Sequence, residues 1–548
     1  MGTTADKLNY LSNTKSLIKN AIVNKGQTIN SGDSFRSFAS KIENIQTGVD
    51  LNDYWNMNPI YGASSIYALI KQFPENINPS NWGNMSNFFS YWGGSSAVGG
   101  IPNIPNWNVS NVKDMTNLFL NCKATQTNIT NLIYWNTSNV TSMVNVFAGA
   151  VFIQNIPNWN TSKVTNLYSA FSQCYNLRNM PNWNTTKVID MSYMYNHCDS
   201  LTTVPNFDTS NVQKMTNMFN VCQNLLTIPN WNTTKVIDMQ YMFYSCTNLI
   251  NVPNLNTIKV ANMQYMFDGC RNLNSVPQLN FYNTINTMYM FRSCHNITTI
   301  SNINIISSIG ITNGQYMFTN CNHLQTISNL IIENINNATH IFFNCVNLQT
   351  VSDLSFTNIN ILIDTFRNCT NLISVSNLKM KNIFTTAAYF FENCINLDTI
   401  SNSLFYNVNN MSTFFNSSLK NAINLNLQKS TVKAMFSSCY NLVTATNIDL
   451  LNVTNTWSLF QQCQKLVNVS LINTSEITLM RYMFQNCNNL SDASIQNIIN
   501  MCLNSNITTV SDKNLSNANM YSPFYQSNII NTRYQNRWTE LTSAGWTY

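Results

Sequence analysis

The residues of this 548-residue chain whose types could do chemistry are its 15 cysteines and four histidines. Two histidines neighbour a cysteine, in the pairs His197–Cys198 and Cys294–His295. A thiol beside an imidazole can act as a nucleophile when it is ionised and accessible, and methionine with cysteine can bind copper. The sequence has no CxxC, HExxH, GxSxG or phosphate-loop pattern. Its 22 acidic residues show no carboxylate pair suited to glycoside hydrolysis. We therefore expect no catalytic residue, no metal site and no cofactor.

The spacing of the cysteines indicates a repeat rather than a reactive centre. From Cys174 to Cys294 each cysteine lies 24 residues after the last, the steps up to Cys394 are 27, 24, 24 and 25, and the step of 24 returns from Cys439 to Cys487. Such a period is typical of a solenoid, and it predicts about 17 repeats. Parallel stacking keeps equivalent Cβ atoms about 4.8 Å apart, whereas a disulfide needs about 3.8 Å. We therefore interpret the cysteines as a column of buried free thiols.

Each repeat is expected to contain one short helix and one short strand. In the stretch from Val188 to Phe207, Val188, Met191, Tyr195 and Cys198 fall on one face of a helix, and a short extended run follows. One such unit cannot bury its apolar face alone, so the repeats must stack. The predicted fold class is an α/β solenoid of about 17 strand–helix repeats of about 24 residues.

Stacking also accounts for the composition. Charged residues make up only 9% of the chain, and 98 residues are asparagine, because stacked amides attract whereas stacked like charges repel. Columns of Phe or Tyr and of Met before the cysteine, and of Leu or Ile after it, are expected to form the core. A column of Asn in the pattern C-x-N-L is expected to satisfy the backbone of the turns.

The repeat string V-x-D-M-x-x-M-F-x-x-C-x-N-L-x-x-I/V-P-N-W-N-T-S resembles the BspA-like leucine-rich repeat family, in its mycoplasma-lipoprotein form. The likeness covers about residues 80–490, with VIDMQYMFYSCTNLINVPNLNT as one example. It implies a right-handed leucine-rich-repeat-like solenoid used for surface adhesion and recognition rather than catalysis. The sequence departs from the pattern after about residue 300, where the Pro of the PN pair becomes Ser, as at Ser301, Ser328, Ser376 and Ser401.

The N-terminal residues 1–48 differ from the repeats and are expected to form a helical hairpin for attachment or oligomerisation. Within it, the stretch TADKLNYLSNTKSLIKNAIVNKG…DSFRSFASKI resembles a short module at the front of many tailed-bacteriophage virion proteins, which implies a link to other virion proteins. The alternative is an N-terminal cap on the solenoid. The expected attachment face consists of Leu8, Leu11, Ile18, Ile22, Phe35, Phe38 and Ile42.

The rest of the chain is divided into a cap with an irregular first repeat at 49–100, the solenoid at 101–490 and a C-terminal cap at 491–548. An amphipathic helix is expected around Ile495, Ile498, Ile499 and Cys502. The start of the chain lacks the apolar core of a secretory signal, and no segment is apolar enough to insert into a membrane. The net charge of +6 is too small to predict a nucleic-acid partner.

Three columns are candidates for ligand binding, each with a structural alternative. The tryptophans after Pro-Asn would stack on sugar rings if exposed, or fill the core if buried; they are Trp107, Trp159, Trp183 and Trp231. Tyrosines five residues before their cysteines would present hydroxyls; they include Tyr193, Tyr241, Tyr265 and Tyr289. A lysine stripe is either a solvated edge or a contact for an acidic wall polymer; it consists of Lys163, Lys187, Lys235 and Lys259.

Three functions follow as hypotheses. The first is a non-enzymatic, tail-associated bacteriophage virion protein, made in the host cytoplasm, whose solenoid recognises a bacterial surface glycan or protein. The second is a bacterial or protist cell-surface adhesin of the BspA-like type. The third is a surface-glycan depolymerase. A homo-oligomer is compatible with each of them.

Overall fold

The computed structural model describes residues 15–16, 18–20, 82–92, 103–506 and 543. The chain divides into two compact units, Met1–Val188 and Ile189–Tyr548. Within each unit successive turns of the chain run parallel and hydrogen-bond to one another. Parallel bridges join equivalent residues, such as Asp114 to Ser142 in the first unit and Lys214 to Asp238 in the second. The predicted solenoid of stacked parallel repeats is therefore confirmed.

The side of each turn that carries the cysteine is a ladder of backbone turns, here called the turn strip. Alternate amides donate to the next turn of the solenoid: the N–H groups of Met239, Tyr241, Phe243 and Ser245 bond to the carbonyls of Asn262, Gln264, Met266 and Asp268 at 2.7–3.1 Å. The amides between them close local turns, as Met242 N–H does on Met239 O at 3.2 Å. The buried backbone is thereby satisfied without a helix.

The predicted helix of each repeat is wrong, and the turn strip explains why. The backbone of Tyr193 and of His197 is left-handed, with φ of 58° and 56°, whereas a helix needs negative φ throughout. Val188, Met191, Tyr195 and Cys198 are nevertheless fully buried, because a left-handed residue in every fourth position gives a burial period close to that of a helix. Periodicity alone does not separate the two structures.

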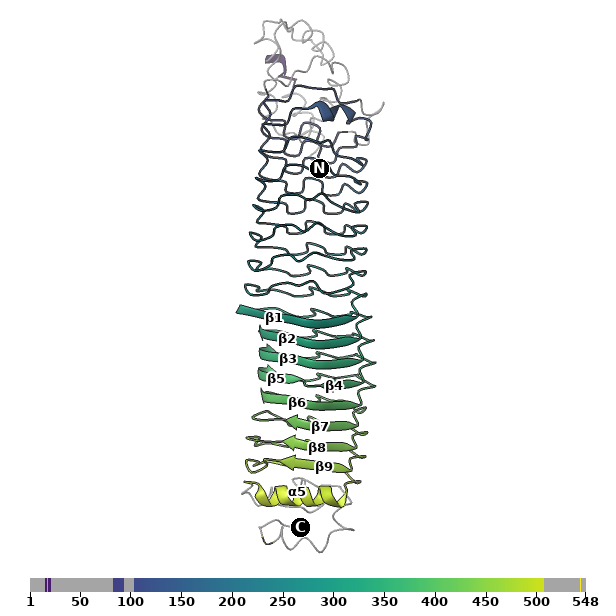
Figure 1. The fold of residues 1–548 in the computed structure, drawn as a ribbon, viewed down its shortest axis with the longest axis vertical. Coiled ribbons are helices and arrows are strands. Elements are labelled where there is room, and N and C mark those ends of the chain that lie inside the picture. Colours follow the sequence, from purple (N-terminus) through teal and green to yellow (C-terminus); the bar gives the residue numbers. More distant parts are fainter. Residues whose placement is uncertain (1–14, 17, 21–81, 93–102, 507–542, 544–548) are drawn as a thin grey trace. The chain divides into compact units, whose positions relative to one another are not determined.

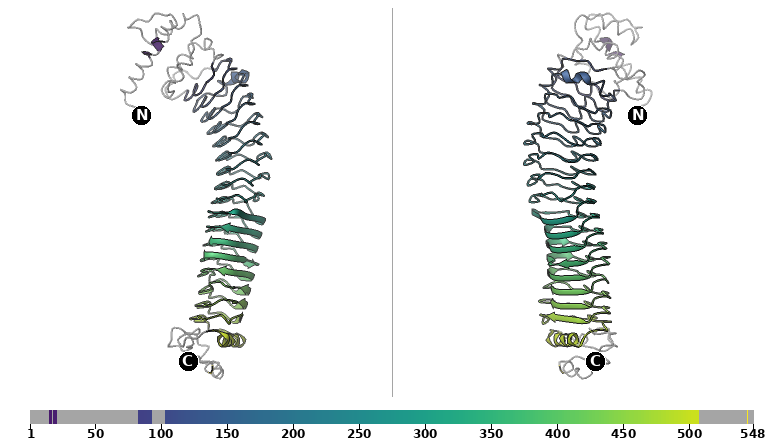
Figure 2. Two further views of the ribbon diagram at one scale, coloured as in Figure 1. Left: turned by 90° about the vertical axis from the view of Figure 1, so that its left-hand side faces the viewer. Right: turned by 45° about the vertical axis from the view of Figure 1, so that its right-hand side comes forward.

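Regular strands begin where proline leaves the repeat. Pro253 and Pro277 occupy the strand position of earlier turns, and proline has no N–H to donate to a ladder. Ser301 takes that position in β1 and pairs in parallel register with Ser328 of β2. From here on the strands form one nine-stranded parallel sheet, drawn as stacked arrows in Figure 1 and Figure 2. They are β1 (Thr299–Ile311), β2 (Thr326–Ile335), β3 (Thr350–Ile361), β4 (Ser374–Ser376), β5 (Lys379–Thr386), β6 (Thr399–Val408), β7 (Asn421–Asn426), β8 (Thr444–Asp449) and β9 (Asn468–Ile472).

The strands bend at asparagines that adopt left-handed backbone. Asn329 and Asn334 of β2 have φ of 49° and 60°, and asparagine tolerates this region better than other non-glycine residues. The side chains then bond from turn to turn, as Asn424 Nδ2 does to Asn402 Oδ1 at 2.9 Å. The asparagine surplus therefore reflects backbone corners as well as stacked amides.

The predicted core columns are confirmed. The column phenylalanines stack on one another in both units, for example Phe119 on Phe147 at 5.0 Å and Phe318 on Phe342 at 5.4 Å between ring centroids. All 15 cysteines are buried and free. Amides of the C-x-N-L column bond to the next amide or to a backbone carbonyl, as Asn272 Nδ2 does to Asn248 Oδ1 at 3.2 Å.

The thiols also make a hydrogen bond that sequence reasoning missed. In most cysteines of the column, the Sγ–H group donates a hydrogen bond to the carbonyl of an aromatic residue in the preceding turn. Examples are Cys246 to Phe219 O and Cys270 to Phe243 O, both at 3.0 Å. A thiol is a weak donor and a small apolar group at once. This combination explains why cysteine, rather than alanine, occupies the column.

Two helices lie among the described residues of the repeats, one in each unit. The expected C-terminal amphipathic helix is confirmed as α5 (Asp492–Asn504), whose Ile495, Ile498, Ile499 and Cys502 are buried. The Ser491 side chain caps it by accepting the Ser494 N–H. A short 3₁₀ helix, η3 (Thr130–Tyr134), lies in the first unit. Among the described helices, none combines the length and apolar composition needed to cross a bilayer.

The expected attachment face lies almost entirely outside the described residues. Ile18 is the one member within them, and it is helical and partly exposed. The others are Leu8, Leu11, Ile22, Phe35, Phe38 and Ile42.

We predict that the left-handed corners limit stability. Asn424 has φ of 55°, so Asn424→Val should lower the free energy of unfolding by about 2 kcal/mol, because a β-branched residue is strained there. Asn424→Gly should cost less, since glycine accepts this φ and only the two side-chain hydrogen bonds, to Asn402 and from Asn447, are lost. Denaturant midpoints of the purified variants measure the difference. Equal midpoints for the valine and glycine variants would contradict the role assigned to φ.

Candidate binding groove

The candidate tryptophans do not form an exposed platform. Trp107, Trp159, Trp183 and Trp231 are 2–5% exposed. In the first unit Trp159 stacks on Trp183 with 6.2 Å between ring centroids, and its Nε1–H donates to Leu132 O at 2.7 Å. The structure therefore shows the alternative interpretation, in which these rings fill the core.

The candidate tyrosines form a half-buried ladder along the turn strip. The rings of Tyr241, Tyr265, Tyr289, Tyr316 and His340 stack with centroids 4.6–4.8 Å apart and interplanar angles of at most 23°. Tyr193 occupies the same position two turns earlier, and Asn217 stands between it and the ladder. Because neighbouring rings cover one another's faces, the ladder presents ring edges and hydroxyls rather than flat stacking surfaces.

An ion pair between the partly exposed Arg292 and the buried Asp268 lies beside the rings of the ladder. Arg292 binds both carboxylate oxygens of Asp268, with Nε–Oδ1 at 2.9 Å and Nη2–Oδ2 at 2.6 Å, and its guanidinium lies 4.4 Å from the centroid of Tyr289. Burial raises the pKa of Asp268, although the hydrogen bonds from Arg292 oppose this. The hydrogen bonds to Asp268 raise the pKa of Arg292. The pair orients the rings and leaves little charge for a ligand.

His340 ends the ladder beside a second charged cluster. Its Nε2 lies 3.3 Å from Asp364 Oδ2, and Arg367 bridges Asp364 and Glu392 at 3.4 Å each. Burial lowers the pKa of His340, while Asp364 acts in the opposite direction. Every acid of this cluster therefore already faces a cation or an imidazole.

The candidate lysines are all exposed, Lys163 and Lys187 in the first unit and Lys235 and Lys259 in the second. Two of them bond to amides of the preceding turn: Lys163 Nζ to Asn139 Oδ1 and Lys235 Nζ to Asn211 Oδ1, both at 2.6 Å. Their exposure and these contacts are those of a solvated edge. Binding of an acidic polymer by the lysines stays a prediction.

The cysteine–histidine pairs do not form an accessible nucleophile. Cys198 and Cys294 are fully buried, and burial raises the pKa of Cys294 well above that of a free thiol. Elsewhere in the column burial raises the pKa of Cys174 to about 12, so this thiol stays protonated at neutral pH. Within the described ranges no group of three or more His, Cys, Asp or Glu residues is placed to hold a metal ion.

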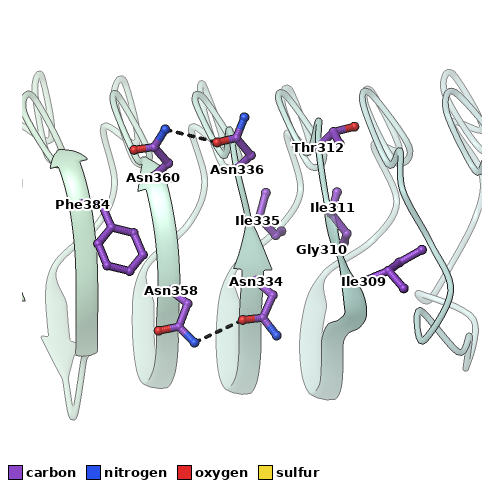
Figure 3. Close-up of a pocket in the computed structure, with 10 residues that line it drawn as sticks. All are labelled: Ile309, Gly310, Ile311, Thr312, Asn334, Ile335, Asn336, Asn358, Asn360 and Phe384. Carbon is purple, nitrogen blue, oxygen red and sulfur yellow. Dashed lines mark hydrogen bonds between the residues drawn. The ribbon is translucent and has the colours of Figure 1, made fainter.

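Among the residues that the structure describes, a shallow groove lies across the ends of β1, β2, β3 and β5, here called the amide groove (Figure 3). Buried isoleucines of the strands lie between two rows of asparagines, as Figure 3 shows for Ile335. The lining residues are Ile309, Gly310, Ile311, Thr312, Asn334, Ile335, Asn336, Asn358, Asn360 and Phe384.

Each row is held by an amide–amide hydrogen bond between the turn that contains β2 and the turn that contains β3. Asn358 Nδ2 donates to Asn334 Oδ1 in one row, and Asn360 Nδ2 donates to Asn336 Oδ1 in the other, both at 3.1 Å. The first row ends at Gly310, which takes the left-handed corner of β1 with φ of 84°. Glycine suits this backbone and adds no side chain, so the groove stays open toward β1.

The two ends of the groove lie at two irregular repeats, those with cysteine steps of 27 and 25 residues. The register of β1 against β2 shifts between Ile306 and Ile311, within the 27-residue repeat, and Ile309 projects there, 58% exposed. The register of β3 against β5 also shifts, because Ile359 and Ile361 pair with Ile383 and Thr386 of the 25-residue repeat, and Phe384 projects there, 53% exposed. β-bulges of this kind re-aim side chains beside functional sites.

Sequence reasoning missed this groove although its signals were present. The cysteine steps of 27 and 25 mark the two inserted segments, and the steps of 24 between them mark the regular strands β2 and β3. The asparagine pairs Asn334–Asn336 and Asn358–Asn360 lie 24 residues apart. The signal in the sequence that could have located the groove is the change in the cysteine step, which marks each inserted segment.

Comparison with known proteins identifies a family for the repeats. A family model described as "Mycoplasma protein of unknown function, DUF285" matches seven overlapping stretches, which are residues 33–131, 83–203, 122–227, 201–304, 247–355, 360–498 and 430–540. Together these stretches span most of the chain. The comparison with curated proteins found no match.

Solved structures similar to this chain include leucine-rich repeat proteins. One is a leucine-rich repeat protein from Bacteroides ovatus, at 17% identity and a TM-score of 0.31 over 61% of this chain and 84% of the other. Another is a leucine rich cell surface protein from Faecalibacterium prausnitzii, at 18% identity and a TM-score of 0.27 over 48% of this chain and 82% of the other.

We predict that Arg292 stabilises the ladder chiefly by neutralising Asp268, whose side chain is 4% exposed. Arg292→Met should lower the free energy of unfolding by about 3 kcal/mol at pH 7, because a buried carboxylate loses its partner. Since the folded-state pKa of Asp268 is raised, its ionised form is unfavourable, and the deficit should shrink as the pH falls through that pKa.

Thermal melting of the variants across pH tests this expectation. The double variant Asp268→Asn with Arg292→Met should recover most of the loss, because the equivalent position two turns earlier is itself an asparagine, Asn220. A deficit that is independent of pH would show that Arg292 acts through packing alone.

Proposed function

We propose that this chain, which belongs to the DUF285 family, is a non-enzymatic recognition protein whose solenoid attaches to a cell surface through the amide groove. The observation that supports this role most directly is that the two inserted segments bordering the groove each expose a large apolar residue, Ile309 in one and Phe384 in the other. Insertions that distort a regular ladder and expose apolar area lower the stability of the fold. Their presence therefore points to another role, such as binding.

The arrangement of the groove suits binding. It is concave and bordered by apolar groups, with a small number of polar groups fixed by their neighbours, which is the usual composition of a ligand site. The amide–amide bonds hold Asn334, Asn336, Asn358 and Asn360 in place before any ligand arrives, so little side-chain freedom is lost on binding.

The finer assignments extend this proposal. We propose a complete stack of about 17 right-handed repeats of about 24 residues, from the cysteine period. Among recognition proteins, the likeness of the N-terminal segment to phage virion modules favours a tail-associated virion protein. That segment would join the chain to other virion proteins. A homo-oligomer is compatible with this assignment. The resemblance of the repeat string to the BspA-like family is the ground for the alternative, a cell-surface adhesin of that type.

Mass spectrometry of purified virions and of fractionated cells separates these two locations. Peptides of the chain in washed particles support the virion assignment, and peptides on intact, surface-labelled cells support the adhesin. A chain found in the cytosolic fraction alone contradicts both assignments.

The recognition role itself predicts a defined loss of attachment. Phe384→Ala should weaken binding of the purified full chain to bacterial cells about tenfold, because exposed aromatic anchors often contribute more than 1 kcal/mol. Phe152→Ala is the matched control, since Phe152 is 48% exposed in the first unit and should leave binding unchanged. Sedimentation of labelled chain with intact cells measures both.

Two results would contradict the proposal. Equal binding by the two alanine variants would remove the amide groove from recognition. Release of soluble glycan fragments on incubation with cells would instead identify a depolymerase.

A further inference from the structure

We infer that the amide groove takes a short stretch of neutral polysaccharide lying along the stack, across the turns of β1, β2, β3 and β5. The inference rests on the proposed recognition role and names the ligand class of the same site. Four observations support it: the free hydrogen-bonding capacity of the amides, the neutrality of the lining, the spacing of the end walls and the state of the backbone beneath.

The amides keep donors and acceptors for a ligand. A side-chain amide has two N–H donors and an oxygen with two lone pairs, and Asn358 and Asn360 each give one N–H to the neighbouring amide. Asn360 Oδ1 accepts one bond from Thr385. Among the described residues, Nδ2 of the exposed Asn336 donates no hydrogen bond to a protein acceptor. Sugar hydroxyls both donate and accept, so they match such half-used amides better than purely anionic groups do.

The lining excludes a ligand that depends on charge. None of the ten lining residues is charged, although the chain carries 28 Lys and Arg and 22 Asp and Glu. An acidic polymer would need cations at the site, because anion recognition relies on Arg, Lys or clustered N–H groups. The complementary ligand is therefore neutral.

The end walls set the length of the bound segment. Ile309 and Phe384 stand on β1 and β5, with β2 and β3 between them (Figure 3). Three strand spacings separate β1 from β5, which gives about 14 Å. The exposed Phe384 ring offers an apolar face for a sugar ring at one end, and Ile309 offers apolar contact at the other. A stretch of a few sugar rings fits between them.

The backbone below the groove is already paired, which argues against a peptide ligand. Strand addition needs an edge with free N–H and C=O groups. β2 pairs in parallel with β1 on one side and with β3 on the other, so β2 has no free edge. A protein ligand would have to bind through side chains alone.

Selective destruction of cell-surface glycan or protein tests the ligand class. Heat-killed bacterial cells are treated either with periodate, which cleaves the vicinal diols of sugars, or with a protease. Binding of the full chain should fall at least tenfold after periodate and should survive the protease. Loss of binding after the protease alone overturns the polysaccharide inference but leaves the recognition role standing, whereas no binding to untreated cells overturns both.

Two matched amide variants place the ligand on the groove. Asn360→Ala should weaken binding to a soluble neutral bacterial polysaccharide about fivefold through the loss of amide hydrogen bonds. Asn272→Ala removes an amide from the ladder of the C-x-N-L column and should leave the affinity unchanged. Melting curves confirm that both variants fold. Equal affinities of the two variants, or stronger binding to a uronic-acid polymer than to the neutral one, would overturn the inference.

Discussion

The structure depends on the hydrogen bonds that join the turn strip of one repeat to the next. Alternate amides, such as those of Tyr241 and Phe243, reach the neighbouring turn, while the amides between them close local turns. This arrangement requires left-handed backbone at regular positions, as at Tyr241 and Ser245. Because it uses every second amide for stacking, one repeat cannot satisfy its own backbone, and the chain is stable only as a stack.

The buried columns follow from this stacking. Equivalent side chains lie one strand spacing apart, so flat rings stack, thiols donate to the carbonyl of the turn before, and amides bond to amides. Charged side chains fit poorly in such columns, and the buried Asp268 is accommodated by Arg292 of the next turn. Departures from the period are correspondingly informative: the two insertions bordering the amide groove interrupt the ladder and expose Ile309 and Phe384.

The sequence predicted the solenoid, its period and its core, because the columns of cysteine, phenylalanine and methionine report directly on stacking. It did not predict the turn strip. The spacing of Met191, Tyr195 and Cys198 is compatible with a helix, and the left-handed φ of Tyr193 is set by bonds to the next turn rather than by local propensity. The burial of the tryptophans also depends on the stack. The only sign of the groove in the sequence was the pair of cysteine steps of 27 and 25 residues. The steps show that residues are inserted, but only the strand register of β1 and β5 shows where the ladder is interrupted.

Amide hydrogen exchange of the native full chain tests the central claim most directly. If the turn strip is stacked as described, the amides of Met239, Tyr241, Phe243 and Ser245 and their equivalents should exchange as slowly as the amides of β1 to β9. Their partners in the next turn would then be released only when the stack opens. Fast exchange along the strip, beside protected strands, would show that its turns are local and would contradict the account.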